Sequence, residues 1–338
     1  MAARSDAWVT LSLAPVPRER VRGWFAGIDD LDLRFPAERT PEAVRAAIGE
    51  AEIVIPDWSS ALHVARPEVD AAARLAFVMS ASVGLDSLDM AALTDAGVVV
   101  ANTAGLNASS VAEWCLAAAF AVARSLVWVD REVRAGSWPQ LELPERGSAE
   151  LGGRRVGVLG FGAVGSRVAR LFTAIGCDVH YWTRRPRPTA EENGATWSEL
   201  DALIARSEIL VVNLALTDET RGLVDARRLD LLPTGAILID ASRGGIVDHG
   251  ALGRLLDTGR LRGAALDVFT TEPLPMDDPI RRSDRILFSS HAAAATAESV
   301  ERIFTLVRSN VARAIAGEPV ESVVNGLDPV IVRRRVTA

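Results

Sequence analysis

The sequence RRVGVLGFGAVG, residues 154–165, runs from an apolar strand pattern into a glycine-rich turn and then into a helix pattern. Gly160, Gly162 and Gly165 have the G-x-G-x-x-G spacing, in which glycines permit a tight turn, close approach of a pyrophosphate and close helix–sheet packing. The helix after the turn would point free N–H groups and the positive end of its dipole at phosphate. Glycine triplets also occur in plain turns, but a second apolar strand pattern at residues 179–182 favours a dinucleotide site.

Composition and charge narrow the class of protein. The 338 residues suffice for two domains, and 49% apolar with 24% charged residues is typical of a globular protein. The formal net charge is −7, so the composition does not indicate a nucleic-acid-binding protein, which normally carries an excess of basic residues. Glu113 and Arg124 interrupt the most apolar segment, residues 111–129, so we expect no membrane span, and we find no signal peptide. The two cysteines, Cys115 and Cys177, predict no metal cage and suit a reduced cytoplasm.

The sequence contains no lysine, because all 37 basic residues are arginine. This excludes a Walker-type phosphate lysine, a Schiff-base lysine and a lysine general base. GC-rich coding is the simplest explanation of the bias. The remaining acid–base candidates are carboxylates and four histidines. Of these, we expect His180 to pack within a strand and His249 to be solvated at a helix start, and His63 lies in a loop.

Strand patterns alternate with helix patterns along the chain, which predicts parallel, doubly wound sheets. The first α/β unit has strand patterns at residues 8–14, 31–35, 52–56, 75–81 and 98–101. A long helix over residues 109–135 and an irregular stretch over 136–153 lead to the glycine-rich strand. The second unit continues with strand patterns at residues 209–213, 236–240, 264–267 and 286–289. A last helix over residues 296–316 ends at Gly317, with Pro319 beyond, which is a typical stop signal.

Three strand ends of the second unit have residues suited to acid–base chemistry. Arg243 follows the strand at 236–240, Glu272 follows the next strand, and His291 follows the last. Because ligands of open α/β sheets bind at the carboxyl ends of strands, we expect these side chains on neighbouring loops over one sheet. Each residue alone is more often structural, but their occurrence together beside a dinucleotide turn indicates catalysis.

These motifs together resemble the D-isomer-specific 2-hydroxyacid dehydrogenases, over nearly the whole chain. The matching segments are SVGLDSLD at 82–89, NTAGLNASSVAE at 102–113, the glycine turn, SRGGIVD at 242–248, ALDVF at 265–269, EPL at 272–274, and His291. The chain departs from the family pattern at three places. Ser289-Ser290 replaces the usual Thr-Pro before the histidine, Asp240 stands where Asn is frequent, and Ala104 stands where Pro is frequent.

The resemblance implies an α/β architecture of two doubly wound parallel-sheet domains. A flavodoxin-like substrate-binding domain would comprise residues 1–102 and 295–338. A Rossmann NAD(P)-binding domain, residues 103–294, would be inserted between these segments. The long helix and the irregular stretch after it are the family's usual dimer contact, so we expect a homodimer.

The resemblance also implies hydride transfer between a nicotinamide cofactor and a 2-oxoacid/D-2-hydroxyacid pair, such as glyoxylate or hydroxypyruvate and their alcohols. Arg243 would bind the substrate carboxylate, His291 would exchange a proton with the ketone oxygen, and Glu272 would orient the imidazole. The expected substrate-binding residues are Ser82, Val83, Gly84, Arg243 and His291. The expected cofactor-binding residues are Gly160, Gly162, Ala163, Val164, Gly165, Thr183, Arg184, Arg185, Leu214, Ala215, Ala241, Ser242, Arg243, Asp267, His291 and Ala292. We expect no metal site and no nucleic-acid or membrane partner.

Two alternative functions remain open on this scaffold. Phosphite and formate dehydrogenases share it, and the formate type pairs its histidine with glutamine, so Glu272 argues against formate but not against phosphite. A nucleotide-sensing corepressor of transcription also shares the fold. That kind of protein usually has extra tails and partner grooves, which are not obvious in this sequence.

The residues after the second strand of the dinucleotide fold indicate the cofactor. NAD-specific Rossmann domains place an Asp or Glu there to bind the ribose 2′-OH. Here the strand is followed by TRRPR, residues 183–187, which contains no acid. A carboxylate would repel a 2′-phosphate, whereas guanidinium groups bind it bidentately, and the run resembles that of the family's NADPH-using glyoxylate/hydroxypyruvate reductases. We therefore predict NADP(H) over NAD(H), with Arg184 as the main phosphate ligand, Thr183 as a hydroxyl partner and Arg185 assisting.

Overall fold

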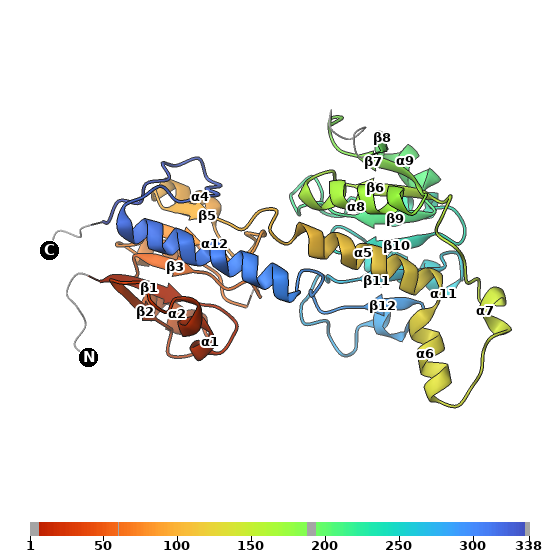
Figure 1. Cartoon of the computed structure of the whole chain (residues 1–338), viewed down its shortest axis with the longest axis horizontal. Helices are drawn as coiled ribbons and strands as arrows, with labels where there is room; N and C mark the ends of the chain where they lie inside the picture. The colour runs from red at the N-terminus through yellow and green to blue at the C-terminus, as the bar shows by residue number, and fades with distance from the viewer. Residues whose placement is uncertain (1–6, 60, 188–193, 335–338) are drawn as a thin grey trace. The chain divides into compact units, whose positions relative to one another are not determined.

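The computed structural model describes residues 7–59, 61–187 and 194–334, which form two compact units (Figure 1). Unit 1 consists of Met1–Asn107 together with Ala297–Ala338, and unit 2 is the continuous segment Ala108–Thr296. Each unit is a parallel β-sheet covered by helices, as the alternation of sequence patterns predicts. The predicted α/β fold class with two parallel sheets is thus confirmed.

The sheet of unit 1 has five strands in the order β2-β1-β3-β4-β5, and its strand pairs are parallel. This 2-1-3-4-5 order is that of flavodoxin-like folds. The strands are β1 (Trp8–Ser12), β2 (Leu31–Arg34), β3 (Ile53–Ile55), β4 (Phe77–Met79) and β5 (Val99–Ala101). The helices are α1 (Arg18–Trp24), α2 (Pro41–Ile48), α3 (Arg66–Ala71), α4 (Met90–Asp95) and α12 (Ala297–Ala316).

The C-terminal part of unit 1 is tied to its N-terminal part by apolar packing and by charge. Val307 and Val311 of α12 lie in the same buried cluster as β1, β3 and β4. Glu52 is 3% exposed, accepts the Val9 N–H at 3.0 Å and binds the guanidinium of Arg333 through both carboxylate oxygens. Since a buried carboxylate is costly without a partner, the pair of Glu52 and Arg333 joins the C-terminal segment to the first sheet.

Unit 2 has a seven-stranded parallel sheet in the order β12-β11-β10-β9-β6-β7-β8. Read from β8, this is the Rossmann order 3-2-1-4-5-6 with β12 added beyond β11. The strands are β6 (Arg155–Leu159), β7 (Asp178–Trp182), β8 (Ala195–Trp197), β9 (Ile209–Val212), β10 (Ile237–Asp240), β11 (Gly263–Leu266) and β12 (Ile286–Phe288). The glycine-rich turn follows β6, at the point where the strand order reverses.

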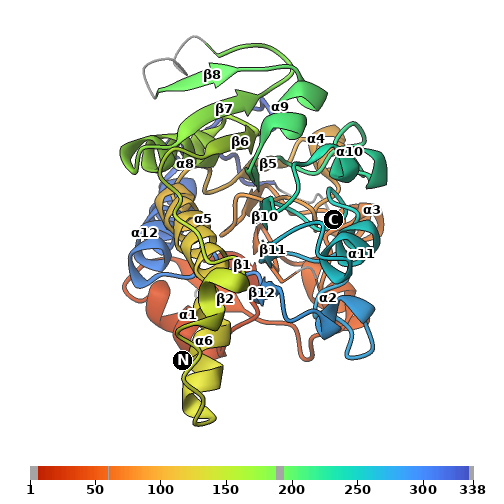
Figure 2. The same cartoon turned by 90° about the vertical axis from the view of Figure 1, so that its right-hand side faces the viewer.

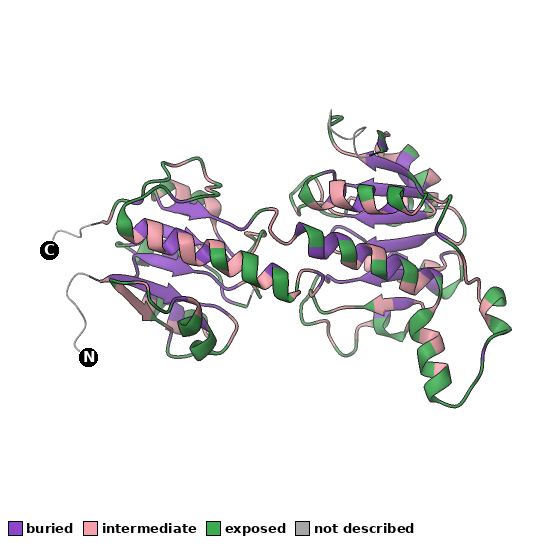
Figure 3. Ribbon diagram, viewed as in Figure 1, coloured by how far each residue is buried: buried purple, intermediate pink, exposed green. Residues whose placement is uncertain are grey.

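Helices cover both faces of the unit 2 sheet (Figure 2). One face is covered by α5 (Ala108–Ala123) and α8 (Ala163–Ala174), and the other by α9 (Leu200–Arg206), α10 (Ala226–Leu231) and α11 (His249–Asp257). The remaining short elements are α6 (Leu126–Arg134), α7 (Glu142–Glu145) and the 3₁₀ helix η2 (Pro279–Arg282). Figure 3 shows the inner strands of both units as buried, as expected for parallel sheets with two covered faces, whereas the edge strands β2 and β12 are only partly buried.

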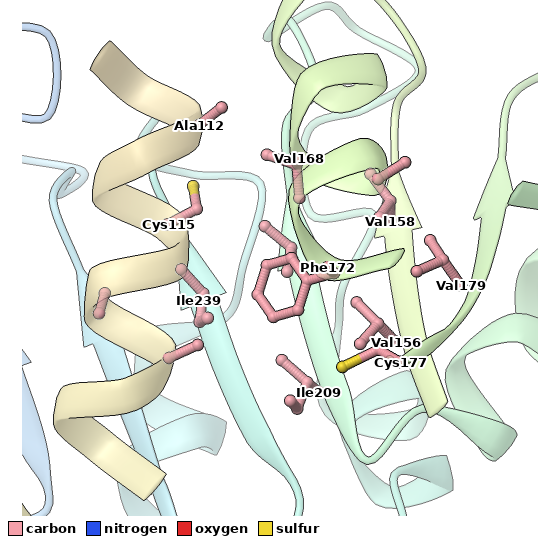
Figure 4. Packing of buried hydrophobic residues seen from close by; sticks show 14 of the residues in the cluster. Ala112, Cys115, Val156, Val158, Val168, Phe172, Cys177, Val179, Ile209 and Ile239 are labelled. Atoms are coloured by element: carbon pink, nitrogen blue, oxygen red, sulfur yellow. The ribbon is translucent and has the colours of Figure 1, made fainter. Parts of the chain in front are cut away.

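Phe172 of α8 lies at the centre of the core between α5, α8 and the sheet (Figure 4). It is fully buried, with Cys115 of α5, Val158 of β6 and Ile239 of β10 in the same cluster. Small side chains on α5 allow this packing, because Ala112, Cys115 and Ala119 let the helix approach α8 closely. The core therefore fixes α8, and with it the helix N-terminus beside the glycine turn.

The prediction of one long helix over residues 109–135 is wrong. The structure has α5 and α6 instead, bent by 59° at a break where Ser125 adopts the left-handed conformation with φ 50°. α5 buries Ala118, Ala119 and Ala123 against the sheet, whereas α6 has no buried residue and leaves it. In the described parts of the chain, no single helix is long and apolar enough to cross a membrane, and only α5 and α6 taken together meet that criterion. A short helix, α7, and the strand β8 also lie where no regular element was predicted.

Candidate active site

The glycine-rich turn has the shape that a pyrophosphate requires. A Cβ atom at Gly160 would lie 2.4 Å from the Asn213 carbonyl oxygen, and one at Gly165 would lie 2.0 Å from the Gly160 carbonyl oxygen. Gly160 also has φ +91°, so these two glycines are needed for the backbone itself. A Cβ at Gly162, in contrast, would meet nothing within 4 Å. Space for a ligand is therefore present where the N-terminus of α8 begins, and no side chain caps that helix.

The segment after β7 presents three exposed arginines, Arg184, Arg185 and Arg187, and no acid. The Thr183 hydroxyl donates a hydrogen bond to the Arg185 carbonyl at 2.6 Å. Trp197 of β8 donates its indole N–H to the Thr183 carbonyl at 3.1 Å, which anchors the segment to the sheet. The acid of this strand, Asp178, stands at its start. The segment therefore offers guanidinium groups, and no carboxylate of its own, where the second strand of the dinucleotide fold ends.

One acid on a neighbouring loop faces Arg184. Hydrogen bonds from the Thr217 hydroxyl and from the backbone, together with the charge of Arg184, hold the pKa of Glu219 below its usual range. Both Glu219 and Arg184 are exposed. Leu214 and Ala215 lie in the same loop after β9, where Leu214 packs on the core and Ala215 is exposed.

His291 and Glu272 form a hydrogen-bonded pair at the ends of β12 and β11. The Nδ1 atom of His291 lies 2.8 Å from Oε2 of Glu272, and the other carboxylate oxygen accepts the Phe269 N–H at 2.9 Å. Burial alone would raise the pKa of Glu272, but the hydrogen bonds from His291 and Phe269 outweigh it and hold that pKa below its usual range. The imidazole is thus oriented through Nδ1, which leaves Nε2 as the ring nitrogen available to a substrate.

Arg243 lies beside this pair, because two loops pack closely. A Cβ at Gly244 would lie 2.0 Å from the Phe269 carbonyl oxygen, so only glycine lets the loop after β10 approach the loop after β11. The charge of Arg243 is close enough to lower the pKa of Glu272. The guanidinium donates to the Ser242 carbonyl at 2.7 Å. The structure therefore brings Arg243, Glu272 and His291 together on three successive strand ends, as the sequence predicts.

Two aspartates lie beneath these loops, and sequence reasoning gave a role to only one of them. Asp267 is 2% exposed, and its carboxylate accepts the N–H groups of Ala292 and Ala293 at 2.7 and 2.9 Å. Asp240 is 0% exposed, and its Oδ1 accepts both the N–H and the hydroxyl of Ser242. Burial, reinforced by the charge of Asp267, raises the pKa of Asp240 to about 7. Its place as the last residue of a strand before the Ser-Arg-Gly motif was the available sequence signal.

The other predicted substrate-binding segment lies in unit 1. Ser82, Val83 and Gly84 follow β4, at the carboxyl end of the five-stranded sheet. The Ser82 hydroxyl donates to the Gly84 carbonyl at 2.6 Å, and the Asn102 amide donates to the Val83 carbonyl at 2.9 Å. The Ser82 N–H donates to the Ser80 hydroxyl at 3.2 Å, so the N–H groups of Val83 and Gly84 are the ones of this segment suited to face an anion.

The prediction that His249 is solvated is wrong. Its ring packs edge-on against Phe269 with centroids 5.8 Å apart, its Nε2 is buried, and burial lowers its pKa. Phe269 from the adjacent loop covers the helix start, which the sequence of α11 alone does not reveal. His180 is buried within β7, with Nε2 3.0 Å from Asp178, and His63 is exposed.

The chain is similar to known proteins in family, sequence and structure. The model of the family described as D-isomer specific 2-hydroxyacid dehydrogenase, NAD binding domain, matches residues 116–293. A glyoxylate reductase of Aeropyrum pernix is 38% identical over 263 residues, covering 75% of this chain and 77% of the relative. A D-3-phosphoglycerate dehydrogenase of Mycobacterium tuberculosis is 35% identical over 298 residues, covering 88% of this chain. The chain spans only 55% of the length of that relative.

The fold is also similar to that of solved structures. D-Lactate dehydrogenase from Aquifex aeolicus, solved in complex with NAD and lactic acid, has a TM-score of 0.81 and 26% sequence identity. The similarity covers 92% of this chain and 96% of that one. D-Mandelate dehydrogenase from Rhodotorula graminis has a TM-score of 0.86 at 21% identity, over 96% and 100% of the two chains, which is evidence of fold alone.

The buried Asp240 makes stability depend on pH in a predictable direction. Its pKa in the folded protein, about 7, lies above the ordinary value of 3.8, so the folded state binds more protons between these values. Stability therefore falls as pH rises through this window, and Asp240→Asn removes that loss. We expect the variant to gain about 2–3 kcal/mol over wild type between about pH 5 and pH 8, measured by denaturant unfolding. The exposed Asp230→Asn is the matched control, and an Asp240→Asn difference that stays constant with pH would contradict the prediction.

Proposed function

The chain belongs to the D-isomer specific 2-hydroxyacid dehydrogenase family, and we propose that it reduces a small 2-oxoacid, such as glyoxylate or hydroxypyruvate, with NADPH. Its family makes it an NAD(P)-dependent enzyme of the 2-hydroxyacid dehydrogenase type, and the proposal adds the substrate and the choice of nucleotide. The observation that supports the proposal most directly is the Glu272–His291 pair beside Arg243, over the carboxyl ends of the sheet that bears the glycine turn.

Each residue of the proposed site has a distinct task in reduction. The bound cofactor supplies the hydride. Arg243 binds the substrate carboxylate, since its planar fork matches two oxygens. His291 donates the Nε2 proton to the ketone oxygen as that carbon is reduced to the alcohol, and takes the proton back in the reverse direction. Glu272 fixes the ring through Nδ1 and stabilises the charged imidazolium before donation.

The proposed cofactor site is formed by residues that follow several strands of unit 2. The N-terminus of α8 and the open side of Gly162 would hold the pyrophosphate. Ala241, Ser242, Asp267 and Ala292 lie at the ends of β10, β11 and β12, where the family resemblance places the nicotinamide. The remaining members of the proposed set are Gly160, Ala163, Val164, Gly165, Thr183, Arg184, Arg185, Leu214, Ala215, Arg243 and His291.

Replacing the proposed acid tests the reaction. His291→Ala is expected to lower kcat for glyoxylate reduction by about a hundred- to ten-thousandfold, because no other group delivers the proton. Binding of NADPH, followed by fluorescence, should change little. His63→Ala, an exposed histidine of unit 1, is the control and should retain wild-type kcat. Turnover by His291→Ala at the wild-type rate would remove His291 from the mechanism.

A panel of substrates separates the proposal from its alternatives. Glyoxylate, hydroxypyruvate, pyruvate, 3-phosphohydroxypyruvate, bulkier 2-oxoacids and phosphite would be assayed with both nucleotides. The similarity to glyoxylate reductases supports a substrate with a small side chain. Tight nucleotide binding without turnover of any compound would favour a sensing protein instead.

The choice of NADPH is tested at Arg184. Arg184 is exposed directly after β7, and the segment 183–187 contains no acid, so its guanidinium group can bind a 2′-phosphate even though Glu219 lies on a neighbouring loop. Arg184→Ala is expected to lower kcat/KM for NADPH about ten- to a hundredfold and to leave NADH nearly unchanged. Arg170→Ala, an exposed arginine of α8, is the control. Better use of NADH than NADPH by wild type would refute the preference.

We further propose that two copies of the chain form a dimer through the surface of α5, α6 and the segment that follows. Exposed apolar side chains gather there: Phe120, Leu126, Val127, Val133, Trp138 and Leu141. Trp138 and Leu141 are 78% and 82% exposed, which is unusual for such residues on a free surface. Light scattering should give twice the mass of the chain, and Val127→Glu should shift the mass toward that of one chain. A wild-type monomer at micromolar concentration would argue against the dimer.

We place the reaction in a reducing cytoplasm. Cys115 and Cys177 are both buried free thiols, which suits a compartment where disulfides are rare.

A further inference from the structure

Asp240 has an unusual environment for a carboxyl group at the edge of a site. It ends β10, it is 0% exposed, and Oδ1 alone makes its hydrogen bonds, both to Ser242. Oδ2 is buried and has no hydrogen-bond partner among the residues that the structure describes. Buried polar atoms normally find partners, so an oxygen left in this state points to a function or to a bound proton.

The groups that face Asp240 come from three elements. Asp267 lies at the end of β11 and donates its backbone N–H to the Asp240 carbonyl at 2.9 Å. Arg243 lies on the loop that Asp240 begins, and its charge lowers the pKa of Asp240. Cys115 of α5 packs beneath, and burial together with both aspartates raises the pKa of its thiol. Asp267 has a backbone N–H on each carboxylate oxygen, whereas Oδ2 of Asp240 has none, so a proton between the two acids is better placed on Asp240.

We propose that Asp240 is a positioning residue that holds the Ser242–Arg243 loop through Oδ1 and sets, through its own protonation, how strongly Arg243 binds the substrate carboxylate. This inference rests on the proposed reduction of a 2-oxoacid, in which Arg243 is the carboxylate ligand. When Asp240 is neutral, its carboxyl group does not offset the guanidinium charge of Arg243. When Asp240 is ionised, its negative charge compensates Arg243 and repels a second carboxylate in a site of low dielectric constant.

The pH at which this change occurs follows from the burial of Asp240. Its pKa of about 7 places ionisation within the range in which enzymes are normally assayed. Substrate affinity should therefore fall as pH rises through neutrality. An asparagine keeps an oxygen to accept the bonds from Ser242 and cannot ionise, so Asp240→Asn mimics the neutral form at every pH.

The test compares KM and kcat for glyoxylate in wild type, Asp240→Asn and Asp240→Ala across neutral pH. Wild type and Asp240→Asn should have equal KM near about pH 6, and wild type should have an about tenfold higher KM near about pH 8. The contribution of His291 protonation is common to both proteins and cancels in their ratio. Asp240→Ala loses the bonds to Ser242, so its kcat should fall at every pH, and recovery of kcat in Asp240→Asn distinguishes the two roles. Asp230→Asn, an exposed change of the same kind, should follow wild type.

A second measurement does not depend on turnover. Infrared difference spectra between Asp240→Asn and wild type near about pH 6 should contain the carbonyl band of a protonated carboxylic acid, which disappears near about pH 8. Absence of that band overturns the inference, and so does a KM ratio that is flat with pH. Failure of wild type to reduce any 2-oxoacid would refute the proposed function, and with it the effect on substrate affinity, even if the band is present. The band would then establish only that Asp240 holds a proton.

Discussion

Parallel strand pairing constrains where chemistry can occur in unit 2. Because the described strands all run in one direction, the loops after β6, β10, β11 and β12 leave the same edge of the sheet. Parallel pairing alone therefore brings four loops to the same edge of the sheet: the glycine turn and the loops that contain Arg243, Glu272 and His291. The close approach of Gly244 to the Phe269 carbonyl then brings the arginine loop and the glutamate loop into one cluster.

The same constraint explains why much of this molecule could be predicted from its sequence. Apolar strand runs and their spacing predict the sheets. Whether a residue precedes or follows a strand predicts at which edge of the sheet it lies. Arg243, Glu272 and His291 could be placed on neighbouring loops by that argument alone. The glycine turn could be interpreted because the glycine spacing itself reports where backbone approaches backbone.

The errors share a different cause, which is tertiary burial. Ser125, which is neither glycine nor proline, separates α5 from α6, and only α5 buries residues against the core, whereas α6 has no buried residue. His249 is covered by Phe269 from another loop. In the sequence, Asp240 resembles an ordinary polar residue at a strand end. Only its complete burial in the structure shows why the pKa of its carboxyl group is raised. The burial of His249 and Asp240 depends on neighbours from other segments, so the sequence around each residue does not indicate it.

The two-segment construction of unit 1 has a consequence for the order in which the chain can fold during synthesis. Arg333 and α12 pack on Glu52 and on the core of the first sheet. Both leave the ribosome only after all of unit 2 has emerged, so unit 1 cannot be completed before then. Unit 2 is continuous and can form as soon as its own strands are available. The growing polypeptide would then hold an unfinished five-stranded sheet whose α12-facing side is covered only in part, by α1, next to a finished domain in the sequence. Nascent chains stalled after residue 296 should accordingly depend on chaperones more than completed chains do.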